Sequence, residues 1–223
     1  MELGEKVWSE VDPRAVLLIP LGSAEQHGPH LPLDTDSQIA SAIATRAAAE
    51  TGAVVAPTLP YGSSGEHADF AGTLSIGTEA LRHVIVELVR SARLTWSRVI
   101  LVNGHGGNHP ALTSAVEQMI DEGHDVSAWW PSVAGGDAHA GRTETSLMLA
   151  IAPERVRIDE AEAGNTAALI ELLPQMQAGG VRGVSPNGVL GDPRGASAGE
   201  GEAMLADLVA SLVGEINRRR LPA

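Results

Sequence analysis

The sequence predicts an α/β protein with three layers, in which helices cover both faces of a mostly parallel central sheet. Two observations support this fold class. Short, apolar, β-branched runs alternate along the chain with longer stretches whose apolar residues recur at helical spacing. Polar segments rich in glycine follow several of these runs. In α/β folds the loops at the carboxyl ends of the strands usually carry the functional site, so these segments are the first place to look.

The first half of the chain contains three expected strands and two expected helices. The strands are expected at residues 15–19, 53–56 and 98–102, where the residues are apolar and often β-branched. The first helix is expected at 37–50, and Gly52 is suited to ending it. After a glycine- and serine-rich loop at 61–77, Thr78 is expected to cap a helix that runs to about residue 94. That helix would place Leu81, Ile85 and Leu88 on one face.

The second half of the chain contains fewer clear signals. A helix is expected at 110–122 and a strand at 126–130. Residues 144–151 begin either a helix or the end of a strand, and 200–218 form a strong amphipathic helix. No element is assigned between residues 152 and 199. The length and the absence of linkers or repeats predict one domain over residues 1–223.

Composition excludes several classes of function. The chain has 15 Lys and Arg against 28 Asp and Glu, and its net charge of −13 argues against a nucleic-acid partner and against an anionic membrane surface. The longest apolar run, 15–21, is far too short to cross a bilayer. No secretory signal is recognisable and there is no cysteine, so we expect a cytoplasmic protein.

The lack of cysteine also limits the chemistry of any metal site. Thiolate catalysis and metal sites with Cys ligands are excluded. A metal would have to be held by His, Asp and Glu, which suits zinc, iron(II) or manganese in a hydrolytic site.

The densest group of such residues follows the first expected strand, at residues 22–36. Glu25 and His27 lie two residues apart, so in an extended segment their side chains project to the same side. Asp36 follows a proline-rich turn and could bridge two metals through its two oxygens. The alternative is that Asp34 or Asp36 only caps the next helix and that the histidines sit in a polar loop.

Three further polar segments lie in loops. His105 sits in the glycine-rich segment 103–108, which lacks the Gly-Lys-Ser/Thr of a phosphate-binding loop. Residues 136–146 contain Asp137, His139 and Glu144, and residues 61–67 end in Glu-His. Five of the eight histidines lie in these four segments and His109 directly follows one of them, which favours a site of His and carboxylate ligands: His27, His30, His67, His105, His109 and His139.

Three of these segments, in this order, resemble the motifs of the creatininase (creatinine amidohydrolase) family: Glu25-Gln-His-Gly-Pro-His-Leu-Pro with Asp36, then Asn-Gly-His105-Gly-Gly-Asn, then His139-Ala-Gly with Glu144-Thr-Ser. The resemblance implies a creatininase-like α/β fold with two divalent metal ions (Zn, Fe(II) or Mn) per subunit at the carboxyl end of the sheet. It implies that Glu25 and His105 bind one ion, that His27 binds the other, and that Asp36 bridges them.

Two positions depart from the family pattern. Creatininase itself has a ligating Glu where this chain has Gly107, and Glu144 is the candidate replacement. The alternative for Glu144 is a buried carboxylate bonded to loop amides. His139 corresponds to a catalytic histidine of the family, but the acid beside it is replaced by Ala138. Glu66 or Asp137 could take the place of that acid.

The carboxyl-terminal part is similar to the branch of the family that acts in mycofactocin biosynthesis, through Ala163-Gly-Asn, Gly179-Gly-Val and Gly188-Val-Leu-Gly-Asp-Pro. That branch implies a peptidase that removes a C-terminal Val-Tyr dipeptide from a modified precursor peptide, with His139 giving a proton to the leaving amine. It also implies a homo-oligomer. Two alternatives stay open: a hydrolase of a small amide such as creatinine or a formamide, and a metal-binding oligomer without catalysis.

Overall fold

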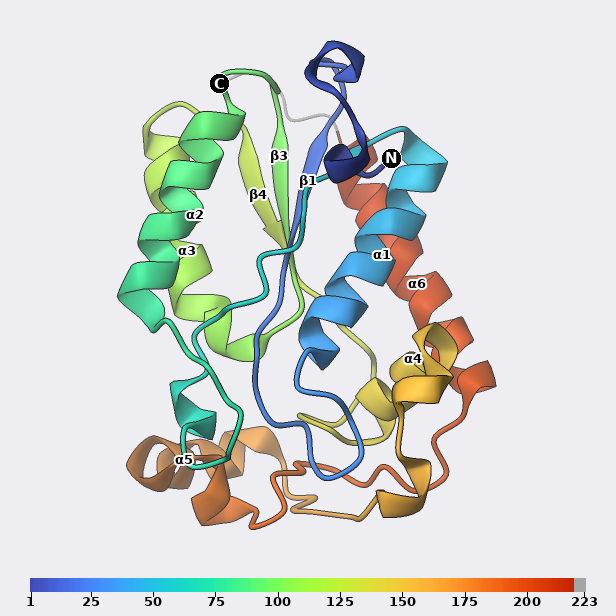
Figure 1. Ribbon diagram of the computed structural model, residues 1–223. Coiled ribbons are helices and arrows are strands. Elements are labelled where there is room, and N and C mark those ends of the chain that lie inside the picture. The colour runs from blue at the N-terminus through green and yellow to red at the C-terminus, as the bar shows by residue number, and fades with distance from the viewer. Residues whose placement is uncertain (219–223) are drawn as a thin grey trace.

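The computed structural model describes residues 1–218, with a parallel four-stranded sheet at the centre (Figure 1). The strands are β1 (Leu17–Leu21), β2 (Val54–Val55), β3 (Val99–Asn103) and β4 (Val126–Trp129), in the order β2-β1-β3-β4. Six α-helices accompany them: α1 (Thr35–Thr51), α2 (Thr78–Ala92), α3 (His109–Asp121), α4 (Arg142–Ile151), α5 (Leu169–Val184) and α6 (Ala198–Asn217). The short 3-10 helices used below are η3 (Gly65–His67) and η4 (Gly106–Asn108). The predicted fold class is confirmed.

Helices cover both faces of the sheet, as Figure 1 shows, with α2 and α3 on one face and α1, α4 and α6 on the other. The strands supply alternate residues to the two apolar layers, because successive side chains point to opposite faces. Leu18 and Ile100 pack with α1 and α6, whereas Leu17 and Leu101 pack with α2 and α3. Strands buried on both faces read as continuous apolar runs, which is why the sequence revealed them.

The first strand begins and ends two residues later than expected. The sequence pattern placed its end at Ile19, just before Pro20, which lacks an amide hydrogen for the sheet. In the structure Pro20 pairs with Val102, and its carbonyl oxygen accepts a hydrogen bond from the amide of Leu59 at 2.9 Å. The strand therefore continues through the proline and delivers the next segment directly to the site.

The expected cap and the expected face of α2 were both partly wrong. Gly77, in the left-handed region at φ 77°, is the cap residue, and Thr78 is the first helical residue. The Thr78 hydroxyl shares a hydrogen bond with Ser63 Oγ at 3.0 Å instead of capping the helix. Leu81 and Ile85 are buried as expected, but Leu88 is 39% exposed, and Val89 takes the inner position.

The other expected helices are present. Helix α1 ends at Gly52, which adopts the left-handed conformation at φ 75° as predicted. Residues 142–151 form helix α4, which decides between the two alternatives for that segment. Helix α5 was not expected at all. It lies across the end of the molecule below the carboxyl ends of the strands (Figure 1). No helix within residues 1–218 is both long enough and apolar enough to span a bilayer.

Candidate metal centre

The predicted site residues converge beyond the carboxyl ends of β1 and β3, where the first turn of α1 approaches the sheet. A side-chain carbon at Gly104 would collide with the backbone carbonyl oxygen of Asp36, so glycine there permits this close approach. The Asp36 carboxylate is buried at the centre of the group. Its Oδ1 lies 3.0 Å from His27 Nε2, and its Oδ2 lies 3.2 Å from His105 Nδ1. The two oxygens of one carboxylate thus face two different imidazoles.

Glu25 is fully buried beside this aspartate. Neither of its carboxylate oxygens has a hydrogen-bond partner of good geometry among residues 1–218. The neighbouring nitrogens are His105 Nε2, 3.1 Å from Oε2, and His67 Nε2, 3.4 Å from Oε1. A buried carboxylate without well-formed hydrogen bonds is costly, and a bound cation can satisfy it.

The ring of His27 is oriented by the main chain. Its Nδ1 lies 3.1 Å from the carbonyl oxygen of Glu25, which can only accept a hydrogen bond, so Nδ1 carries the hydrogen. This leaves Nε2 free as a ligand atom. Nε2 faces Asp36 and lies 3.9 Å from Oε2 of Glu144, at the start of α4. Such a backbone contact on the second nitrogen is typical of metal-binding histidines.

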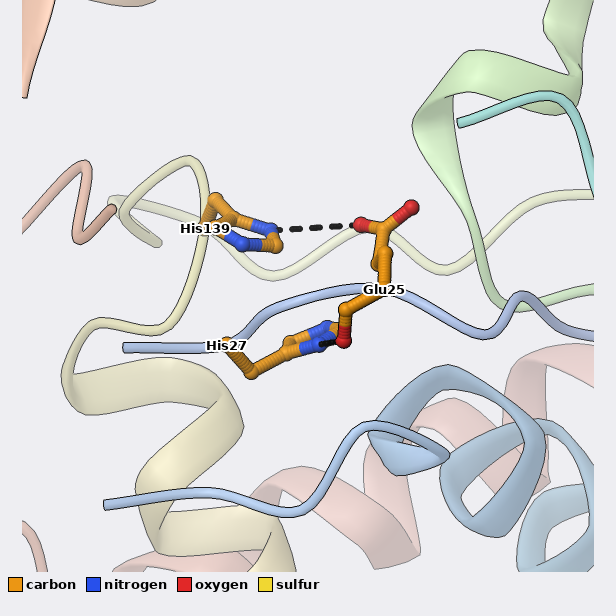
Figure 2. A group of neighbouring side chains, drawn as sticks. All are labelled: Glu25, His27 and His139. Atoms are coloured by element: carbon orange, nitrogen blue, oxygen red, sulfur yellow. Dashed lines mark hydrogen bonds and ion pairs between the residues drawn. The ribbon is translucent and has the colours of Figure 1, made fainter. Parts of the chain in front are cut away.

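Three overlapping triplets have ligand atoms within 4.8 Å of one another: Glu25 with Asp36 and His105, His27 with Asp36 and Glu144, and Glu25 with His27 and His139. Figure 2 shows the third triplet, in which Glu25 and His139 approach each other while His27 turns toward the backbone of Glu25. The first two triplets share Asp36. Because Nε2 of His27 faces Asp36 and Glu144, the second triplet uses its free nitrogen better than the third.

His139 is buried and held by a residue that sequence reasoning missed. Its Nε2 lies 2.8 Å from the backbone oxygen of Gln26, so the hydrogen is on Nε2 and Nδ1 is free, 3.7 Å from Glu25 Oε1. The side-chain amide of Gln26 lies 2.8 Å from Nδ1 of His67, whose ring is 4.5 Å from that of His139.

Several ionisable groups lie close together in this buried site, and they shift one another's pKa values. Burial raises the pKa of Glu25 to about 7. Burial opposes a charge on His27 and on His105, but the carboxylates of Asp36 and Glu25 raise their pKa values to about 10 and about 9. Burial, helped by charged His27, holds the pKa of His139 well below its usual range, so this ring is neutral. Protons and cations compete for the same ligand atoms here.

The surroundings of Gly107 leave no room for a side chain at this position. A side-chain carbon at this position would lie 2.5 Å from Oε1 of Glu66 and would also collide with His105 and with the backbone of Ser63. Glu66, in η3, therefore occupies the space that a residue at 107 would need, and its Oε1 lies 3.6 Å from His105 Nε2.

A cavity of about 800 Å³ opens above these residues. Its polar lining includes Asp36, His105, His139 and Glu144, and much of its apolar lining comes from α5. A second cavity of about 380 Å³ adjoins it at Gly104, Gly106, Ala138 and Glu144 and is lined by Trp130 and Val133. The larger cavity can hold a short peptide segment, and the polar side chains of the protein lie at one side of it.

Several polar residues of the motifs lie outside the centre. Asp34 pairs with Arg155, with Oδ1 2.8 Å from Nη2, and His30 Nε2 lies 2.8 Å from the Thr145 hydroxyl. Asp137 accepts hydrogen bonds from the amides of Arg142 and Thr143, so its carboxylate is engaged with the first turn of α4.

Two arginines near the start of α4 and before α6 are paired with acidic side chains. Arg142 Nε lies 2.8 Å from Glu200, and Arg194 Nη2 lies 2.6 Å from Asp192 on the surface.

Comparisons with known proteins identify the family of this chain. The family described as Creatininase: Creatinine amidohydrolase matches residues 5–216. The chain is 53% identical over 211 residues to the mycofactocin precursor peptide peptidase of Mycobacterium ulcerans, covering 91% of this chain and 84% of the relative. It is 31% identical over 192 residues to the creatinine amidohydrolase of Pseudomonas putida, covering 70% of this chain and 74% of that protein.

Solved structures of creatininase resemble the whole fold. A manganese form of creatininase superimposes with a TM-score of 0.79 at 26% identity, and 96% of each chain is covered. A mutant creatininase of the Zn-Zn type superimposes with a TM-score of 0.79 at 27% identity and the same coverage. The motifs, the parallel sheet and the buried cluster of histidines and carboxylates thus have one explanation, which is that this chain belongs to the creatininase family.

Proposed function

We propose that this chain is a metal-dependent peptidase of mycofactocin biosynthesis, which removes the C-terminal Val-Tyr dipeptide from the modified precursor peptide. Relatives that are about half identical carry the name of that peptidase. The buried cluster offers the donor set that a hydrolytic metal site needs, because histidine nitrogens and carboxylate oxygens are the usual ligands of zinc, iron(II) and manganese.

The observation that carries this proposal is the environment of Glu25 and Asp36. Glu25 is buried without a partner of good geometry among residues 1–218, and Asp36 turns one oxygen to His27 and the other to His105. Glu25, Asp36 and His105 would hold one divalent cation, and His27, Asp36 and Glu144 would hold a second. Glu144 would then replace the ligand that creatininase has at the position of Gly107.

The catalytic chemistry is divided between cations and protein. Two divalent cations would supply a nucleophile derived from water at neutral pH and would polarise the amide carbonyl. His139 would supply the proton transfer. Its Nε2 is occupied by the Gln26 carbonyl oxygen, and its free Nδ1 faces the cluster from the cavity wall. A neutral ring in this position can accept a proton and return it to the leaving amine.

The proposal is tested by incubating the protein with the modified precursor peptide and following the mass of the products. The protein loaded with Zn²⁺, Mn²⁺ or Fe²⁺ should release the dipeptide, and the chelated protein should not. Elemental analysis should find two ions per chain. Cleavage that continues unchanged after complete removal of metal would overturn the metal-dependent mechanism.

The same assay separates the alternatives. Creatinine and a formamide are offered to the metal-loaded protein beside the peptide, because relatives with those small substrates belong to the same family. Turnover of creatinine alone would replace the peptidase by a small-molecule amidohydrolase. Bound metal without hydrolysis of any amide would favour a binding protein. The homo-oligomer and the cytoplasmic location stay predictions, and light scattering tests the former.

A further inference from the structure

The apolar residues of helix α5 lie partly in a buried cluster and partly in the wall of the cavity. Leu172 and Val181 are buried on one side, where they pack with Leu190 and Phe70. Leu169, Leu173 and Met176, at positions i, i+4 and i+7, line the cavity of about 800 Å³ above the candidate metal centre, and Met176 also packs against the buried cluster. We call Leu169, Leu173 and Met176 the apolar wall.

The apolar wall is open toward the cavity. Leu169 is 42% exposed and Leu173 is 37% exposed, although both are large apolar side chains. The wall faces the same cavity as His105, His139 and Glu144. An exposed apolar surface that continues into a polar, buried site is typical of a binding groove.

We propose that the apolar wall is the specificity surface of this enzyme and holds an apolar side chain of the peptide next to the bond that is cleaved. This inference rests on the proposed function, because it assigns the surface to the substrate of that reaction. The identity of the occupant follows from the cavity that the apolar wall shares with the polar residues of the site. A peptide whose amide reaches His139 and Glu144 must pass through the cavity, and the side chain beside that amide meets Leu169 and Leu173.

Helix α5, which carries the apolar wall, packs against η3 beside the candidate metal centre. Helix α5 is interrupted at Gly179 and Gly180, and Gly180, at φ 64°, brings the chain against the backbone oxygen of Glu66 in η3. The next residue of η3 is His67, whose Nε2 faces Glu25. The helix that would recognise the substrate therefore packs against the segment that contributes to the centre.

Polar substitutions at two exposed residues of α5, one in the apolar wall and one outside it, test the inference. Leu173→Asn removes an apolar side chain from the cavity wall, whereas Ile170→Asn makes the same kind of change at a residue of α5 that is 74% exposed and does not line the cavity. With the modified precursor peptide, Leu173→Asn should lower kcat/KM about tenfold or more, mostly through KM. Leu173→Met should restore it, and Ile170→Asn should leave it within about twofold.

A second readout uses the dipeptides Val-Tyr and Ala-Ala as competitors of peptide cleavage. The wild type should bind Val-Tyr more tightly, and Leu173→Asn should reduce that preference. An unchanged KM and unchanged inhibition by both dipeptides in Leu173→Asn would overturn the inference. A change in oligomer mass with unchanged KM would also overturn it, because the wall would then be a contact between copies. Failure of the metal-loaded wild type to cleave the peptide would refute the proposed function itself.

Discussion

The two sides of the site cavity differ in composition, in origin and in what they contribute. The polar floor consists of Glu25, His27, Asp36 and His105, from the loops after β1 and β3 and the start of α1. Asp36 and His105 line the cavity, and Glu25 and His27 are buried against them. The apolar wall comes from one helix far along the chain and contains no titratable group. We infer that catalysis depends on the polar floor and that substrate recognition depends on the apolar wall. Substitutions in the floor should change turnover and metal content, whereas substitutions in the wall should change affinity for the peptide.

The largest effect is expected from Asp36→Asn. An amide keeps the shape of the side chain but loses the charge and one acceptor oxygen, so it cannot bridge two cations. We expect kcat for peptide cleavage to fall by about 10³-fold or more. Elemental analysis should show loss of metal in the same variant.

Asp34→Asn is the matched control for this change. Asp34 is a carboxylate two residues away that pairs with Arg155 and lies outside the centre. Its kcat should stay within about twofold of the wild type. Equal losses in both variants would mean that the floor is a structural cluster of charges and not a metal centre.

The next effect is expected from His139→Gln. If this ring transfers protons, kcat should fall by about 10²- to 10³-fold while both ions stay bound. His83→Gln, at an exposed position of α2, is the control. Loss of metal in His139→Gln would assign His139 as a ligand of the triplet in Figure 2, with Glu25 and His27, and would refute its role in proton transfer.

A smaller effect is expected from Glu144→Gln, because Glu144 belongs to only one of the two triplets that share Asp36. We expect one ion per chain instead of two, with kcat lower by about 10²-fold. Glu154→Gln, an exposed carboxylate just beyond α4, serves as the control. Retention of two ions in Glu144→Gln would show that another residue completes the second site, with Glu66 the first to examine.

Metal uptake should release protons from the floor. In the metal-free protein the pKa of His27 is raised to about 10 and that of His105 to about 9, so both rings are protonated at pH 7.5. A cation must displace these protons, so its apparent affinity should fall as the pH is lowered. Titration calorimetry in two buffers of different ionisation enthalpy should show release of about two protons at this pH.

A variant in the apolar wall is the control for this measurement. Leu173→Asn changes no titratable group, so its proton count should equal that of the wild type. Metal binding without proton release at pH 7.5 would contradict the ligand roles of His27 and His105.

The polar floor could be predicted from the sequence because its residues lie in short motifs directly after strands. A strand buried on both faces reads as an apolar run, and the parallel arrangement brings Glu25 and His105 to the same edge of the sheet. Even so, Gln26 was missed, since its part in holding His67 and His139 depends on contacts between segments distant in sequence.

The apolar wall could not be predicted in this way. Pro174 lies within α5, and Gly179 and Gly180 interrupt it, so the local pattern indicates a break rather than a helix. Packing of Leu172 and Val181 on Leu190 stabilises the helix despite these residues, and tertiary contacts of this kind are not visible in a local window.

The central claim is that Asp36 is shared by two cations, and anomalous scattering from crystals of the metal-loaded protein tests it most directly. Data collected at the absorption edge of the bound metal should show two peaks about 3.5–4 Å apart. One peak should lie among Glu25, Asp36 and His105, and the other among His27, Asp36 and Glu144. A fully active crystal form with a single peak, or with no peak beside Asp36, would contradict this claim.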